Sequence, residues 1–241
     1  MQSNNMKPTM SLCVVGSKLT GTGGMCSSLA PKKETKKPKI EKTGIFSANN
    51  ATDFTIFKKH YDRGDLPIRV NFDGVHRSLK WWLDPKELDY KYYLPIFLEG
   101  LRERTEPYQF LAENGAIGMI VQGRDKIKDV LPDLIFPLKR ALHTKDHDIM
   151  CKTLKIIQRM VIEHPVIGED LVPFFRQLLP VCNLFRVRNK NIGDKIDYAQ
   201  QKNKCLGDLI QETLEVLERY GGEDAYINIK YMMPTYESCM F

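Results

Sequence analysis

A proline preceded by a branched apolar residue recurs along the chain at nearly equal intervals. The pairs are Leu94-Pro95, Leu131-Pro132 and Val172-Pro173, and their prolines lie 37 and 41 residues apart. This spacing is close to the period of HEAT and armadillo repeats, in which pairs of helices stack on one another. Because proline is tolerated in the first turn of a helix, we expect each pair to open a helix. The repetition predicts a predominantly all-α solenoid, and chance recurrence in an ordinary helical bundle is the alternative.

Two segments show the apolar periodicity of amphipathic helices clearly. The first follows Asp146, a residue type that caps helix N-termini. Its apolar positions are Met150, Leu154, Ile157 and Val161. The second ends at Gly221-Gly222, and its repeating positions are Leu206, Ile210, Thr213, Leu214 and Leu217. Steps of three and four residues place each set on one helix face, so each segment is predicted to bury one side.

A β-hairpin is predicted at about residues 68–82. Ile68, Val70 and Phe72 alternate with polar residues before Asp73-Gly74, the dipeptide typical of a tight hairpin turn. The second strand continues through Leu79 and Trp81. This alternation predicts that the apolar residues share one side of the hairpin.

The last segment, after Gly222, is predicted to be extended. Ala225, Ile227, Ile229 and Tyr231 alternate with polar residues, so they fall on one side of an extended chain that lies along the helices. Three tyrosines and two methionines accompany them: Tyr226, Tyr231, Tyr236, Met232 and Met233. They either pack on the preceding helices or form an apolar patch for a partner, and packing is favoured.

The excess positive charge lies at the N-terminus. Residues 1–42 contain eight lysines and two glutamates, a net charge of +6 that equals the net charge of the whole chain. The remaining residues carry 28 basic and 28 acidic side chains. Residues 1–51 lack apolar periodicity, so we expect a disordered basic tail, followed by one domain over residues 52–241. The tail is either a solubilising appendage or an arm that docks on an acidic protein polymer, nucleic acid or an anionic membrane.

A second basic segment interrupts the helical pattern at residues 186–205. It contains few apolar residues and several basic ones, so it is predicted to be a surface loop inserted between helices. The residues with the strongest claim to a partner contact are Arg186, Arg188, Lys190 and Lys195. A solvated loop without a partner is the alternative.

The sequence contains no motif in which residues suited to catalysis or metal binding stand at the required spacing. The glycines of Gly16-Ser-Lys-Leu-Thr-Gly21 have the spacing of a phosphate-binding loop, but Thr22 occupies the position of the required lysine. His143 and His147 lie four residues apart in a predicted turn rather than inside a helix. Six scattered cysteines without a CxxC pair favour reduced, mostly buried thiols. We therefore expect no enzymatic activity, no cofactor and no metal.

No stretch of the chain predicts secretion or membrane insertion. The apolar run at residues 10–15 is shorter than the apolar region of a signal peptide, and no window approaches the roughly 18 apolar residues of a membrane span. We expect a soluble intracellular protein.

Four stretches resemble the parkin co-regulated gene product family. They are KKHYDRGDLPI at 58–68, KELDYKYYLPIFLEGL at 86–101, IDYAQQK at 196–202 and GDLIQETLEVLERYGGEDAYINIKYMMPTYESC at 207–239. The resemblance covers residues 52–240 and implies a HEAT/armadillo-like protein of the ciliary and flagellar axoneme. It also implies a place in the cytoskeleton at the inner junction of doublet microtubules, where the protein alternates with a β-sandwich companion and joins the B-tubule to the A-tubule.

These implications give the basic segments a partner. Tubulin is acidic, so the tail lysines are predicted tubulin contacts: Lys32, Lys33, Lys36, Lys37 and Lys39. The four basic residues of the loop are predicted to contact tubulin or a neighbouring axonemal protein. A soluble solenoid adaptor that binds a small protein partner is the first alternative, and nucleic-acid binding by the tail is the second. The neutral charge of the remaining chain argues against nucleic acid.

Overall fold

The computed structural model describes residues 44–45, 55–72, 77–123, 125–186 and 205–240. All of them belong to one compact unit, residues 42–241. In chain order its elements are α1 (Ile56–Arg63), β1 (Ile68–Asn71), β2 (Ser78–Trp81), the 3-10 helix η1 (Pro85–Glu87), α2 (Tyr90–Gly100), α3 (Tyr108–Gly123), α4 (Lys126–His143), α5 (His147–Glu163), α6 (Pro165–Leu171), the 3-10 helix η2 (Val172–Phe174), α7 (Phe175–Asn183), α8 (Leu206–Tyr220) and α9 (Glu223–Met232). The described residues are therefore predominantly helical, with one small antiparallel sheet.

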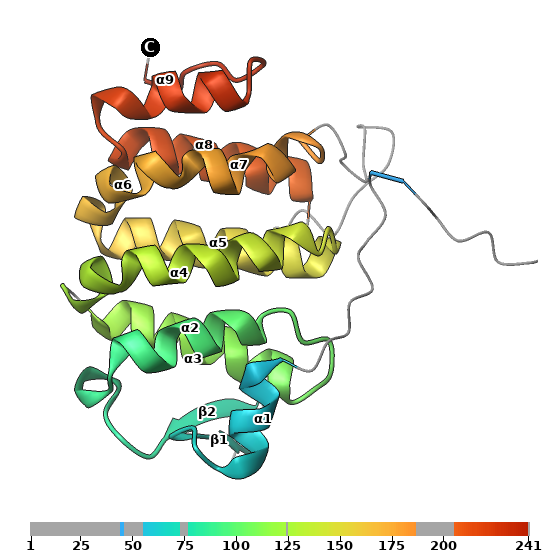
Figure 1. The fold of residues 1–241 in the computed structure, drawn as a ribbon, viewed down its shortest axis with the longest axis vertical. Coiled ribbons are helices and arrows are strands. Elements are labelled where there is room, and N and C mark those ends of the chain that lie inside the picture. The colour runs from blue at the N-terminus through green and yellow to red at the C-terminus, as the bar shows by residue number, and fades with distance from the viewer. Residues whose placement is uncertain (1–43, 46–54, 73–76, 124, 187–204, 241) are drawn as a thin grey trace, which may run out of the picture. The chain divides into compact units, whose positions relative to one another are not determined.

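The longer helices pack in two rows. In one row α2 packs on α4, α4 on α7 and α7 on α9; in the other α3 packs on α5 and α5 on α8. The rows contact each other where α2 meets α3 and α4 meets α5. Figure 1 shows these layers following the order of the chain, with the hairpin and α1 at one end and α9 at the other.

The two helices with the clearest periodicity are confirmed as α5 and α8. The predicted apolar positions of both helices are buried, and the two helices pack against each other. At their contact the Gln158 amide donates a hydrogen bond of 2.9 Å to the Thr213 hydroxyl group. Asp146 is confirmed as the N-cap of α5, because its carboxylate accepts a hydrogen bond from the Asp148 backbone N–H. In these two helices, both the residues predicted to be buried and the residue predicted to cap α5 are found as expected.

The prediction that the repeated prolines open helices is wrong for Pro95 and Pro132, whereas Pro173 stands in the first turn of the short 3-10 helix η2. Pro95 lies inside α2, Pro132 lies inside α4, and Pro173 lies in η2 ahead of α7. A proline inside a helix removes one backbone hydrogen bond. In α4 both Pro132 and Lys128 are exposed, so water can reach the Lys128 carbonyl group that loses its helical donor. Pro95 and Pro132 lie on consecutive helices of one row, and Pro173 lies directly ahead of the next helix of that row, α7.

The hairpin is confirmed, and its inner side packs on α3. Ile68 pairs with Trp81 and Val70 with Leu79, and Ile68 and Val70 are buried. The Trp81 indole lies over Gly118 of α3, where an added Cβ would come within 3.1 Å of it. Phe72 does not share this side, because β1 ends at Asn71 and the Phe72 side chain is 71% exposed.

The predicted extended segment after Gly222 is wrong, because residues 223–232 form helix α9. Ala225 and Ile229 are four residues apart and buried, whereas Ile227 and Tyr231 are exposed. Of the aromatic and methionine residues in this region, Met233 and Tyr236 are fully buried. Packing is therefore confirmed for these two residues, but Tyr231 projects into solvent.

A buried carboxylate links α2 to α4. Glu99 is 8% exposed, and its Oε1 accepts hydrogen bonds from Arg102 at 3.2 Å and from Arg140 at 2.5 Å. Arg102 lies three residues after Glu99 in the chain, whereas Arg140 belongs to α4. Two guanidinium groups thus compensate one desolvated charge, and one of them reaches it from the neighbouring helix.

Within the described ranges, no helix combines the length and the apolar character that crossing a membrane requires.

Candidate functional site: a basic and aromatic face of the hairpin

The predicted tail contacts cannot be placed. Lys32, Lys33, Lys36, Lys37 and Lys39 lie outside the described residues, as do Arg188, Lys190 and Lys195 of the predicted loop. Their contacts to tubulin or other partners stay predictions. Of the predicted loop, the structure describes only the two end residues, Arg186 and Cys205.

Arg186 contacts its own chain. One guanidinium nitrogen donates a hydrogen bond of 2.6 Å to the Thr235 hydroxyl group, and the other donates one of 3.0 Å to Gln211 of α8. The guanidinium carbon lies 5.8 Å from the centre of the Tyr236 ring. Arg186 therefore holds the end of α7 to α8 and to the segment after α9, a role that the sequence did not indicate. Its proposed contact to a partner stays a prediction.

Four residues form what we call the C-terminal clasp: Glu218 of α8 with Tyr236, Ser238 and Cys239. Glu218 accepts hydrogen bonds from the Tyr236 hydroxyl group at 2.7 Å, from the Cys239 N–H at 3.0 Å and from the Ser238 hydroxyl group. The Cys239 thiol lies 3.1 Å from the same carboxylate. Burial acts to raise the pKa of Glu218, but these donors outweigh it and lower the pKa to about 2. Burial and the bond to Glu218 raise the pKa of Tyr236 above its usual range.

The histidines and buried cysteines have structural partners. His143 ends α4, where its Nδ1 lies 2.9 Å from the Lys139 carbonyl oxygen, and His147 opens α5 beside Asp148 and Cys151. Cys151, Cys182 and Cys205 are buried and form no disulfide with another described cysteine, and burial raises the pKa of Cys182 to about 12. Where side chains are described, no group of three or more His, Cys, Asp or Glu residues is arranged to hold a metal ion.

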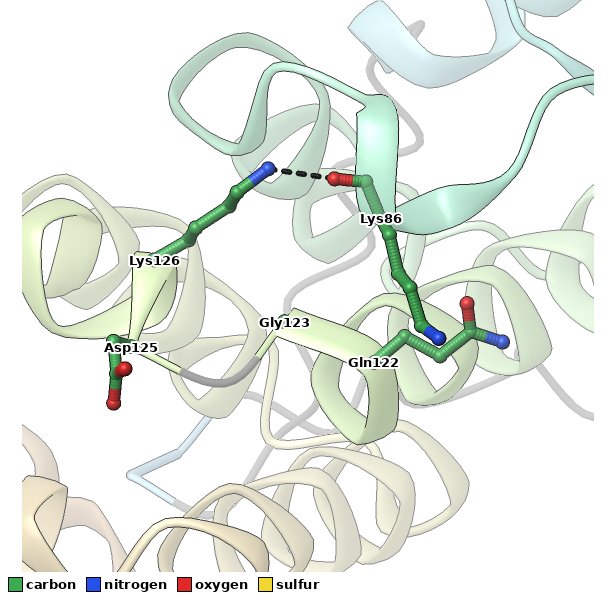
Figure 2. A pocket seen from close by; sticks show the side chains of 5 residues that line it. All are labelled: Lys86, Gln122, Gly123, Asp125 and Lys126. Carbon is green, nitrogen blue, oxygen red and sulfur yellow. Dashed lines mark hydrogen bonds between the residues drawn. The ribbon is translucent and has the colours of Figure 1, made fainter.

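An open hollow of about 310 Å³ lies between η1 and the start of α4 (Figure 2). The Lys126 ammonium group donates a hydrogen bond of 2.6 Å to the Lys86 carbonyl oxygen and lies 5.5 Å from the centre of the Tyr90 ring. Burial and the nearby Asp84 carboxylate raise the pKa of Tyr90, so the ammonium group faces a neutral phenol. The Gln122 Oε1 atom is buried without a hydrogen bond from any described residue. The described lining residues present polar groups to a small solute and include no nucleophile paired with a base.

The hairpin outer face carries a different combination of side chains. We use this name for Arg69, Ser78 and Lys80, which the strand register places on the side opposite the buried Ile68 and Val70, together with Trp82, the residue that follows β2. Arg69 and Lys80 are direct partners across the two strands, and both are exposed. Trp82 continues this side beyond β2, with its backbone N–H bonded to the Pro67 carbonyl oxygen, and its side chain is 67% exposed. The face therefore presents two adjacent cations beside a large aromatic ring.

This face is unpartnered within the described part of the chain. Neither Arg69 nor Lys80 has an acidic partner there, whereas the neighbouring Arg77 pairs with Glu106 at 3.0 Å. Like charges directly opposite each other in a hairpin disfavour the fold. The Arg69–Lys80 pair therefore contributes repulsion to the hairpin rather than stability.

The hairpin outer face is not among the sites predicted from the sequence, although the sequence contains one signal for it. The alternation that predicts Ile68 and Val70 inside also predicts Arg69 outside, and Lys80 stands between Leu79 and Trp81 in the same way. Alternation alone does not fix which residue lies opposite Arg69, so its pairing with Lys80 required the structure.

Comparison with known proteins gives the family. The family model for Parkin co-regulated protein matches residues 55–238. The chain belongs to the Parkin co-regulated protein family. The Parkin coregulated gene protein homolog of Mus musculus is 51% identical over 186 residues, which cover 77% of each of the two chains. The resemblance inferred from the four sequence stretches is therefore confirmed. The family match begins at Thr55, so it includes the hairpin and all the helices described above but none of the tail lysines.

Proposed function

We propose that this chain is a non-catalytic, microtubule-binding structural protein of ciliary and flagellar doublet microtubules. In this role it bridges the walls of the A- and B-tubules at the inner junction, beside a β-sandwich companion protein. The observation that carries the proposal is membership of the Parkin co-regulated protein family across residues 55–238.

The arrangement of the helices supports a role as a rigid spacer. Helices that follow each other in the chain pack in two parallel rows, and we propose that these rows form a HEAT/armadillo-like solenoid. A junction protein must hold two contact surfaces at a fixed distance. The hairpin outer face at one end of the rows and α9 at the other are suited to this task, because the core between them is continuous.

The net positive charge of the N-terminal residues supports a proposed contact with an acidic partner. The +6 charge of the first 42 residues suits an acidic surface such as that of tubulin, where each lysine adds a favourable contact. Physiological salt screens exposed charges beyond roughly 8 Å, so binding of this kind weakens as salt is added. Many copies along a polymer add weak contacts through multivalency.

The test is co-sedimentation of the full chain with purified microtubules. We expect the full chain to pellet with microtubules and to be released by added salt. Replacing the five tail lysines by glutamine should weaken binding several-fold. A matched control keeps the composition of residues 30–42 but shuffles their order, and it should bind like the natural chain if charge alone determines the contact.

The loop is tested in the same assay with Arg188→Gln, Lys190→Gln and Lys195→Gln combined. Arg186 is left unchanged, because its bonds to Thr235 and Gln211 would confound a loss of binding with a loss of packing. If the full chain stays in the supernatant at low salt, the microtubule-binding role is wrong.

A soluble adaptor is the second candidate, and α9 favours it. Ile227 and Tyr231 lie four residues apart on this helix and are 66% and 71% exposed, a pattern that suits an apolar contact with a partner. An adaptor remains in the supernatant with and without the tail. Density for intact doublet microtubules with and without this chain distinguishes the two roles directly.

A further inference from the structure

We propose that the hairpin outer face binds a carboxylate-rich polypeptide segment of a partner protein. The inference rests on the proposed function and deepens it, because it assigns a partner contact to the folded body rather than to the tail. The occupant is defined by its chemistry: at least two neighbouring acidic side chains beside an apolar or aliphatic group.

The two cations define the acidic part of the partner. Arg69 and Lys80 are cross-strand partners, and side chains in such pairs have Cβ atoms about 5 Å apart. No described acidic residue neutralises either of them. Two carboxylates of one extended segment can approach two cations at this spacing, and the Arg69 guanidinium group can bind one of them in a bidentate manner.

The tryptophan defines the apolar part. Trp82 follows Lys80 by two residues on the same side of the hairpin, and its ring is mostly exposed. Its neighbour in sequence, Trp81, takes the opposite direction and packs 5.9 Å from the Phe97 ring. An exposed tryptophan beside arginine is typical of the residues that dominate protein interfaces.

The hairpin is held firmly enough to present these groups. Its inner side packs on α3 through Ile68, Val70 and Trp81. A bound segment therefore needs little reorganisation of the face, and the cost of binding falls mainly on the partner.

The size of the face favours a polypeptide over nucleic acid or a lipid surface. Strong binding of nucleic acid requires neutralisation of several phosphates, and the described body has only two unpaired cations on this face. Binding to anionic lipid likewise needs a cluster of four or more basic residues, or an exposed amphipathic helix. A short acidic segment needs only the two cations and the ring.

The experiment measures binding of a fluorescein-labelled twelve-residue polyglutamate peptide by anisotropy at low salt. It uses the full chain in two backgrounds, natural and with the five tail lysines replaced by glutamine, so that the tail cannot mask the hairpin. In the tail-neutralised background, we expect Arg69→Gln combined with Lys80→Gln to weaken binding by about tenfold, and Trp82→Ser, which loses contact with the methylene groups of the glutamate side chains, by about threefold.

The matched control removes the same charge elsewhere. Arg176→Gln combined with Arg219→Gln replaces two exposed cations of α7 and α8 and should change binding less than twofold. Thermal unfolding provides a second readout, because loss of the repulsion between Arg69 and Lys80 should leave the melting temperature unchanged or raise it. Equal weakening by the hairpin and control variants overturns the proposal. So does competition by a twelve-nucleotide single-stranded RNA, or by phosphatidylserine vesicles, that is stronger than competition by unlabelled polyglutamate.

The same variants in the microtubule assay separate this inference from the proposed function. If hairpin variants lose peptide binding while the natural chain fails to pellet with microtubules, the proposed function fails and the acidic contact stands. If the natural chain pellets and the hairpin variants match the control in both assays, the hairpin inference fails and the proposed function stands.

Discussion

The Tyr236 hydroxyl group donates a hydrogen bond of 2.7 Å to the Glu218 carboxylate, and both side chains are buried. This bond ties the segment after α9 back to α8. Ser238 and Cys239 donate to the same carboxylate, so a buried charge is solvated by the chain itself. The C-terminal clasp therefore couples the stability of the fold to the ionisation of Glu218.

We expect Glu218 to make stability depend on pH in the acidic range. Its folded-state pKa of about 2 lies below the ordinary value of 4.5. The unfolded chain therefore binds the proton more tightly, so the free energy of unfolding rises with pH. The carboxylate contributes about 3 kcal/mol above pH 5, and this contribution is lost as the pH falls from about 5 to 2. Glu218→Gln should unfold more easily than the natural chain at pH 7, and this difference should shrink towards pH 3.

Urea denaturation at a series of pH values measures this difference. Glu212→Gln on the exposed side of α8 is the control, and it should leave both the stability and its pH dependence nearly unchanged. A gap between the natural chain and Glu218→Gln that is equal at pH 7 and pH 3 would contradict the assignment.

Removing the charge of Glu99 should destabilise the fold by about 3 kcal/mol. Glu99→Gln leaves the guanidinium groups of Arg102 and Arg140 without a compensating carboxylate, and the Arg102 side chain is only 7% exposed. The comparison is Glu163→Gln, which breaks the solvent-exposed pair with Arg159 and should cost at most about 0.5 kcal/mol. Chemical denaturation checks both values, and equal losses would show that the Glu99 cluster behaves like a surface pair.

Gly115→Ala should destabilise the protein, although alanine favours helices over glycine by about 1 kcal/mol. An added Cβ at Gly115 would lie 2.3 Å from Cε1 of Phe97, so α2 and α3 would have to separate. The expected net loss is about 1–3 kcal/mol. Combining Gly115→Ala with Phe97→Leu should cost less than the sum of the single losses, because the smaller side chain makes room. A melting temperature that rises in Gly115→Ala would refute this close approach.

Asp146 has two roles that can be separated. One carboxylate oxygen caps α5 by accepting from the Asp148 N–H at 3.1 Å, and the other lies 2.8 Å from Arg104. Asp146→Asn keeps the cap and loses the ion pair, so we expect a loss of at most about 0.5 kcal/mol. Asp146→Ala loses both, and the expected loss is about 1–2 kcal/mol. Similar losses in the two variants would mean that the ion pair, not the cap, carries the stability.

Periodicity predicted α5 and α8 well, because each of these helices buries one face and exposes the other. It gave no comparable signal for α3, which is contacted by α2, α5 and the hairpin and is therefore apolar on several sides. In α3 the informative residues are Gly115 and Gly118, and the structure shows why small residues are needed there.

The error in α9 arose from two patterns in the same residues. Ala225 and Ile229 fit both the two-residue period of a strand and the four-residue step of a helix. Ile227 and Tyr231 fit only the two-residue period, so together the four residues predicted an extended segment. Glu223 and Asp224 directly after Gly222 are the charges that helix N-termini favour, and they point to the helix that forms.

The candidate site was predicted only in part. Alternation places Arg69 and Lys80 outside, but their pairing depends on a strand register that local sequence does not fix. The partners of Arg186 lie 25 and 49 residues away along the chain, so no local pattern could reveal them.

The helix rows have a consequence for biosynthesis. Because packing partners succeed one another along the chain, each newly made helix meets a surface that is already in place, and the nascent protein can fold from the hairpin onwards. Tyr236 follows every helix, so the bond to Glu218 is among the last to form. A product broken off before Tyr236 retains a buried carboxylate that has lost its donors, and we expect cellular proteases to remove it faster than the finished protein.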